Sequence, residues 1–154
     1  MKLIARLFLF WLCAALSVHA AEAVPPASYD PALAKQTGAN EQGMRKYVLV
    51  ILKTGPNKVP AGPARDEMFK GHFSNMKRLA AEGVLAHAGP LDGVDGWRGL
   101  FILAVDTIDE ARKHVATDPV IVQGEMVAEY HTHYGSAALM LMSSLYPKVA
   151  RQPM

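Results

Sequence analysis

Cysteine is almost absent from this sequence, since Cys13 is the only one among 154 residues. It lies inside the apolar run Leu7–Leu16 (LFLFWLCAAL), which has the composition of a segment that is removed on export. A mature chain without Cys13 has no disulfide, no thiolate nucleophile and no cysteine-ligated zinc. A lipoprotein signal needs a small residue just before its cysteine, and Leu12 stands there instead.

A long hydrophobic run is missing as well. The run from 7 to 16 would span only ~15 Å as a helix, about half of a hydrocarbon core, so it is too short for a lasting anchor. Lys2 and Arg6 precede it, and Val18-His19-Ala20 offers small residues at the −3 and −1 positions of a signal peptidase site. The sequence therefore predicts a cleaved signal peptide over residues 1–20, a periplasmic or secreted protein, and no stable membrane span after cleavage. Cleavage after Ala21 or Ala23 is the alternative, since both are alanines too.

The chain also lacks an excess of one charge. It has 16 Lys and Arg against 14 Asp and Glu, and two of the basic residues, Lys2 and Arg6, belong to the predicted signal. No basic run occurs and the aromatic residues are not interleaved with Lys or Arg, so nucleic acid is not an expected partner. A Gly-rich phosphate loop, a G-x-S-x-G motif and a zinc-protease motif are likewise missing from the sequence.

The patterns that are present predict an α+β domain. Apolar and alternating stretches indicate strands, and stripes at three- and four-residue steps indicate helices. Strands are expected over residues 47–52, 84–88, 97–105 and 126–134, and helices over residues 65–82 and 107–117. Gly89-Pro90 is expected to end the second strand, and Thr107 with Glu110 forms a capping box that begins the second helix. The resulting order β-α-β-β-α-β is that of the ferredoxin-like fold, with two helices on one face of a four-stranded antiparallel sheet.

The remaining segments complete a single-domain organisation. Residues 21–43 contain several Pro and Gly and few large apolar residues, so they are expected to be a flexible N-terminal segment. The domain is predicted over residues 44–146, followed by a tail over 147–154. An extra C-terminal helix is predicted over Ser136–Tyr146.

The other face of the predicted sheet has no partner within the domain. An apolar sheet face is not stable in water, so it is expected to meet a second copy of the chain. The sequence therefore predicts a homodimer.

Three residues are candidates for a reactive or binding site. His72 lies on the apolar stripe of the first helix, three residues after Phe69, where its ring needs a polar partner. Asp118 precedes Pro119, which restricts it to extended backbone directly after the second helix. Arg98 has the planar fork that binds carboxylates. The alternatives are a structural core histidine, a helix-terminating aspartate and a surface ion pair.

A polar row is expected on the last strand. Residues two apart share a face, so Glu129, His131 and His133 lie together on one side. His131 and His133 are ~6.7 Å apart along a strand and are candidate metal ligands, with His72 or His87 as a conceivable third ligand. The alternative is a polar row that faces solvent or a wet pocket, in which His131 contacts a small-molecule ligand.

Six sequence segments between residues 46 and 135 resemble sequences of the YciI-like (YCII-related) family. They are KYVLVILKTGP, GHFSNMKRLAAEG, HAGPL, DGWRGLFILAVDT, ATDPVIVQGEM and AEYHTHYG, in the family's order. The resemblance implies a dimeric α+β barrel. It also implies that His72 and Asp118 form an acid–base pair, in which Asp118 fixes the tautomer of the imidazole and raises its basicity.

Two functions follow from these expectations. The first is an enzyme without a cofactor, an isomerase, lyase or dehalogenase that acts on a small lactone or carboxylic acid. His72 and Asp118 would be catalytic, and Arg98 and His131 would bind substrate. The second is a non-catalytic exported homodimer that binds a small molecule or a metal.

Overall fold

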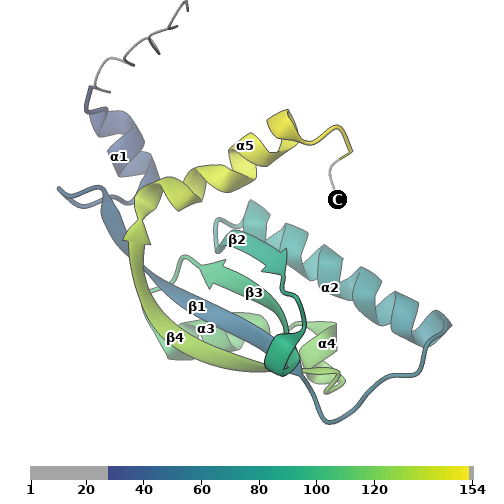
Figure 1. Cartoon of the computed structure of the whole chain (residues 1–154). Helices are drawn as coiled ribbons and strands as arrows, with labels where there is room; N and C mark the ends of the chain where they lie inside the picture. Colours follow the sequence, from purple (N-terminus) through teal and green to yellow (C-terminus); the bar gives the residue numbers. More distant parts are fainter. Residues whose placement is uncertain (1–27, 153–154) are drawn as a thin grey trace, which may run out of the picture.

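The computed structural model describes residues 28–152, which are built around one antiparallel four-stranded sheet (Figure 1). Its strands are β1 (Met44–Thr54), β2 (Leu85–Pro90), β3 (Trp97–Leu103) and β4 (Met126–Ser136). They lie in the order β2-β3-β1-β4, so β1 and β3 are the central strands and β2 and β4 are the edge strands. This is the strand order of a ferredoxin-like fold, and the α+β class predicted from the sequence is confirmed.

The strands extend further than the apolar patterns predict. β1 and β4 pair along their whole lengths, from Met44 opposite Ser136 to Thr54 opposite Met126. Main-chain pairing does not require apolar side chains, so the sequence pattern marks only the buried middle of each strand. Likewise β2 continues through Gly89-Pro90, which was expected to end it. Proline is tolerated there because β2 is an edge strand.

Three helices pack on one face of the sheet: α2 (Pro63–Ala81), α3 (Ile108–Val115) and α4 (Pro119–Val122). The side chain of Thr107 accepts a hydrogen bond from the Glu110 N–H, as the predicted N-cap of α3 requires. The short α4 was not predicted. These helices and the sheet share one hydrophobic core, which includes Val48, Val50, Leu52, Met68, Leu79, Phe101, Leu103, Ala111, Val115 and Val120.

Because alternate residues of a strand face opposite sides, β1 has a helix face and an outer face. Val48, Val50 and Leu52 point to the helices, so Tyr47, Leu49 and Ile51 belong to the outer face. Residues directly opposite one another in an antiparallel pair share a face, which places Leu100 and Ile102 of β3 on the outer face too.

The ends of the described chain form further short helices. Within the segment expected to be flexible, α1 (Pro31–Thr37) is capped by the Asp30 side chain, and Gly38 ends it with a φ of 69°. A 3-10 turn, η2 (Ala137–Leu141), leads into α5 (Met142–Val149), which broadly matches the predicted C-terminal helix.

A second 3-10 turn, η1 (Val94–Gly96), joins β2 to β3. The predicted signal peptide over residues 1–20 lies outside the described residues. Within residues 28–152, no helix is both long and apolar enough to cross a membrane.

Candidate active site

The first candidate side chain comes from the middle of α2. Met68, His72, Asn75 and Leu79 are the buried residues of this helix, spaced at three- and four-residue steps on one stripe. His72 is 7% exposed, so its ring is surrounded by protein rather than by water. A polar ring at such a position is stable only with a hydrogen-bond partner.

That partner is Asp118, which is fully buried at the junction of α3 and α4. Pro119 holds Asp118 in extended backbone, with φ −78° and ψ 126°, and begins α4. One carboxylate oxygen, Oδ1, accepts from the Val120 N–H at 3.1 Å and caps this short helix. Asp118 was expected to end the preceding helix; its side chain in fact begins the next one.

His72 and Asp118 form a short, buried contact. Nδ1 of His72 lies 2.8 Å from Oδ2 and 2.9 Å from Oδ1 of Asp118. A carboxylate only accepts hydrogen bonds, so the neutral ring carries its proton on Nδ1 and leaves the lone pair on Nε2. Nε2 has no hydrogen-bond partner among residues 28–152, so it is free to meet a ligand.

A second layer of polar groups supports this pair. The Asn75 amide lies 3.5 Å from Oδ2 of Asp118, while the Asn75 carbonyl accepts from Arg78 at 2.8 Å and from the Thr117 hydroxyl at 3.1 Å. These donors fix which way the Asn75 amide points. Within the described chain, no buried side-chain nitrogen or oxygen is left without a partner.

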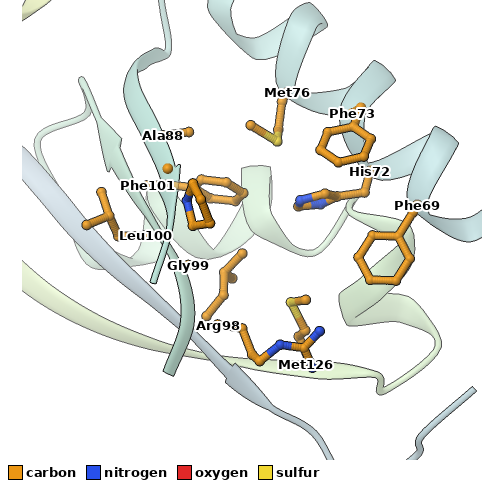
Figure 2. A pocket seen from close by; sticks show the side chains of 13 residues that line it. Phe69, His72, Phe73, Met76, Ala88, Arg98, Gly99, Leu100, Phe101 and Met126 are labelled. Carbon is orange, nitrogen blue, oxygen red and sulfur yellow. The ribbon is translucent and has the colours of Figure 1, made fainter. Parts of the chain in front are cut away.

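The His72 ring borders a mostly apolar cavity of about 330 Å³ between α2 and the strands β2 and β3 (Figure 2). The Phe101 ring is stacked on it with a centroid separation of 6.0 Å, Phe73 lies at 5.4 Å, and Phe69 meets it edge-on at 6.1 Å. The other residues that line the cavity are Leu52, Met76, Ala88, Gly89, Pro90, Arg98, Gly99, Leu100 and Met126. This volume lies at the small end of the range for ligand sites.

Arg98 lines the same cavity and is the second polar side chain in it. It lies 3.8 Å from the carboxylate of Glu125, a residue that is only 2% exposed. Glu125 is bound more closely by Arg65 of α2, at 2.6 Å, and by the Val59 N–H, at 2.7 Å. The expected carboxylate-binding arginine is therefore in the cavity, beside an ion pair.

The groups around Glu125 lower its pKa. Burial raises the pKa of Glu125, but the hydrogen bond from the Val59 N–H, the hydrogen bond and charge of Arg65, and the charge of Arg98 together outweigh it. Its pKa therefore lies below the ordinary value, and the group is a carboxylate at neutral pH.

The polar row of β4 lies on the other side of the sheet. His131 is paired with Leu49 and Glu129 with Ile51, so these residues occupy the outer face, away from His72. Nε2 of His131 lies 2.8 Å from Glu129, and the hydrogen bonds from His131 and Lys53 hold the pKa of Glu129 below its usual value. The structure does not bring His131 to the cavity of His72 and Arg98.

The candidate metal ligands also lack a completed site. The ring of His133 lies against Tyr47, with centroids 6.1 Å apart, and His72 faces the other side of the sheet. Among residues 28–152, no three His, Cys, Asp or Glu side chains are grouped so that they can hold a metal ion.

Asn75, Arg65 and Glu125 were not singled out from the sequence. Glu125 follows Gly124 and directly precedes the last strand, which suggests an exposed position for a charged residue. A buried carboxylate was identifiable only through its partners, and these are distant in sequence: Arg65 precedes it by 60 residues.

Comparison with known protein families identifies the domain. No curated protein matches the chain. The sequence model of the YCII-related domain matches residues 46–131, which is more than half of the chain and includes His72, Arg98, Asp118 and Glu125. The match ends at His131, within β4. The chain belongs to the family of YCII-related domain proteins, as the order of its sequence phrases predicted.

Proposed function

We propose that this protein is an acid–base catalyst for a small lactone or carboxylic acid, with His72 as the general base. The observation that carries the proposal is the buried contact between Nδ1 of His72 and Asp118 beside a cavity of ligand size. The contact fixes the tautomer and orients the ring, so Nε2 is the basic atom at the cavity. A positioned histidine of this kind suits proton transfer near neutral pH.

The reaction starts with removal of a proton from a carbon next to a carbonyl. Nε2 of His72 takes the proton, and the C–H electron pair moves onto the carbonyl oxygen to form an enolate. Return of the proton to another carbon gives an isomer, while departure of a leaving group from the neighbouring carbon gives an elimination product. The Asp118 carboxylate, in contact with Nδ1, stabilises the imidazolium that forms in between. No cofactor is needed for these steps.

The test is hydrogen exchange in a substrate panel. Small lactones and carboxylic acids are incubated with the protein in D₂O, and loss of their C–H signals is followed by proton NMR. We expect His72→Gln to lower the exchange rate by about 10²–10⁴, the usual contribution of a general base. Asp118→Asn also lowers it, because an amide can donate to Nδ1 and favour the wrong tautomer.

His114→Gln is the matched control, since His114 lies on α3 and does not line the cavity. Thermal unfolding of each variant separates loss of chemistry from loss of the fold. An exchange rate that is the same in wild type and His72→Gln excludes His72 as the base. Binding without any exchange would favour the second function, a non-catalytic binding protein.

We also propose that the protein is exported and works as a homodimer. The signal pattern at residues 1–20 supports export, and the half-buried Leu49 and Ile102 on the outer sheet face support a second copy there. The mass of the protein recovered from the cell envelope tests the first point, because cleavage after Ala20 removes residues 1–20. The intact mass in that fraction would contradict cleavage.

A further inference from the structure

The cavity beside His72 has a second, electrically charged end. Its lining is aromatic and aliphatic apart from two side chains, His72 from α2 and Arg98 from β3. Figure 2 shows both entering the same space between the helix and the strands. Any ligand that reaches Nε2 of His72 therefore has the Arg98 guanidinium within the same small enclosure.

The donors of Arg98 are not used by any residue between 28 and 152. Oε1 of Glu125 is bound by Arg65 at 2.6 Å, and Oε2 accepts from the Val59 N–H at 2.7 Å. Arg98 lies 3.8 Å from Oε1, which is beyond hydrogen-bond distance. Within residues 28–152 the guanidinium of Arg98 has no hydrogen-bond acceptor, although its side chain is only 31% exposed.

The three charges leave an excess of one positive charge at the cavity. Glu125 carries one negative charge, while Arg65 and Arg98 carry one positive charge each. Arg65 neutralises Glu125 at close range, so the positive charge of Arg98 is the one that remains. A partly buried charge without a hydrogen-bonded partner is costly, and one anionic group on a ligand compensates it.

We propose that the cavity binds a small monoanionic carboxylate with a flat apolar body, and that Glu125 is the positioning residue that holds Arg98 to receive it. The carboxylate lies on Arg98, and the body packs against Phe69, Phe73 and Phe101 with its reacting C–H at His72. This specifies the substrate class of the proposed reaction as an acid anion rather than a neutral lactone. The binding geometry rests on Arg98 and Glu125, whereas turnover rests on the proposed function.

The test uses benzoate and benzamide, which have the same shape and differ in charge. Each is titrated into the protein, and the methyl NMR signals of Met76 and Met126, which line the cavity, report binding. We expect benzoate to bind at least about tenfold more tightly than benzamide, since charge-assisted hydrogen bonds are stronger than neutral ones. In Arg98→Met this preference disappears. Arg112→Met is the control, because Arg112 stacks on Tyr130 and lies outside the cavity.

Two further variants test the count of charges. In Arg65→Gln, Glu125 is left to pair with Arg98, so benzoate binding weakens although Arg65 does not line the cavity. In Glu125→Gln the excess becomes two positive charges, and we expect the preference to move from benzoate towards the dianion isophthalate. A purely structural role of Glu125 weakens both ligands alike and does not change their ratio.

The inference is overturned if benzamide binds as tightly as benzoate, or if Arg98→Met keeps the preference. These results are independent of turnover. A benzoate preference that depends on Arg98, in a protein without hydrogen exchange, supports the carboxylate site and contradicts the proposed catalysis. Hydrogen exchange on neutral lactones without any benzoate preference supports the proposed catalysis and contradicts the carboxylate site.

Discussion

His72 and Asp118 each occupy a position in the core where a single polar group would be unstable. Their side chains are 9% and 0% exposed, and their contact at 2.8 Å supplies the partner that each one needs. Truncating one partner leaves the other buried without a hydrogen bond, which typically costs about 1–3 kcal/mol or more for a charged group. The pair is thus coupled to the stability of the fold as well as to the proposed chemistry.

The first prediction concerns the tautomer of His72. Because Nδ1 faces a carboxylate, we expect the neutral ring to carry its proton on Nδ1, and ¹⁵N NMR of labelled histidine distinguishes the two ring nitrogens. In Asp118→Asn the amide can either donate or accept, so the signal should shift towards the Nε2–H form. A wild-type ring protonated on Nε2 would contradict the proposed role of Asp118.

The second prediction concerns the acid stability that Glu125 provides. Since the folded-state pKa of Glu125 is depressed, its contribution is fully present above the unfolded value of about 4.3 and is lost as the pH falls through the lower folded value. At pH 7 we expect Glu125→Gln to reduce the free energy of unfolding by roughly 3–5 kcal/mol, because Arg65 loses a buried partner.

Urea unfolding as a function of pH measures this effect. The difference between wild type and Glu125→Gln should shrink as the pH falls below about 4.3. Glu129→Gln is the comparison, because the pKa of Glu129 is also lowered but its side chain is 44% exposed, so we expect a much smaller change. A difference that stays constant down to acid pH would mean that Glu125 acts through packing rather than charge.

At the scale of elements, the sequence predicts the main helices and strands well because their core faces have clear periodicity. The buried positions of α2 and the Thr107 cap of α3 are examples. It does not predict α4, whose four residues are too few to show a period. His72 and Asp118 are recognised through the family resemblance, whereas Asn75 and Glu125 depend on contacts across 42 and 66 residues of chain, which a local pattern does not contain.

The approach of α2 to α4 decides whether the site residues meet. A Cβ at Gly71 would lie 2.9 Å from Cγ of Pro119, so these two elements touch where His72 faces Asp118. Alanine normally stabilises a helix interior by about 1 kcal/mol relative to glycine. Here the extra methyl group must displace the Pro119 ring, which is rigid and directly follows Asp118.

We therefore expect Gly71→Ala to be destabilising by roughly 1–3 kcal/mol, as overpacked cores are, and to slow the proposed exchange. Ser74→Ala is a matched control, because Ser74 is exposed on the same helix and gains only the better helix propensity. Thermal and urea unfolding of both variants measure the change in the free energy of unfolding relative to wild type. A Gly71→Ala protein that is stabilised as much as Ser74→Ala would show that α2 and α4 have room between them.

At the scale of the whole molecule, the two faces of the sheet have different surroundings. The helix face is covered by α2, α3 and α4 (Figure 1). The cavity lies on this side, between α2 and the sheet. The outer face carries aliphatic residues on β1 and β3 beside the polar row of β4, and the turn η2 and helix α5 contact β2. A second copy on the outer face would therefore lie on the opposite side of the sheet from His72.

The last prediction tests that second copy. If two outer faces pack together, a charge in their centre must be buried without a partner, so we expect Ile102→Lys to convert a dimer into a monomer. Light scattering coupled to size-exclusion chromatography measures the mass. Val122→Lys is the control, because Val122 is 70% exposed on α4, on the helix side of the sheet.

Since Ile102 lies on the opposite face from His72, benzoate binding should survive in the monomer if the cavity is complete in one chain. A wild-type protein that is monomeric at every concentration would contradict the dimer, and loss of benzoate binding in a folded monomer would mean that the partner contributes to the site.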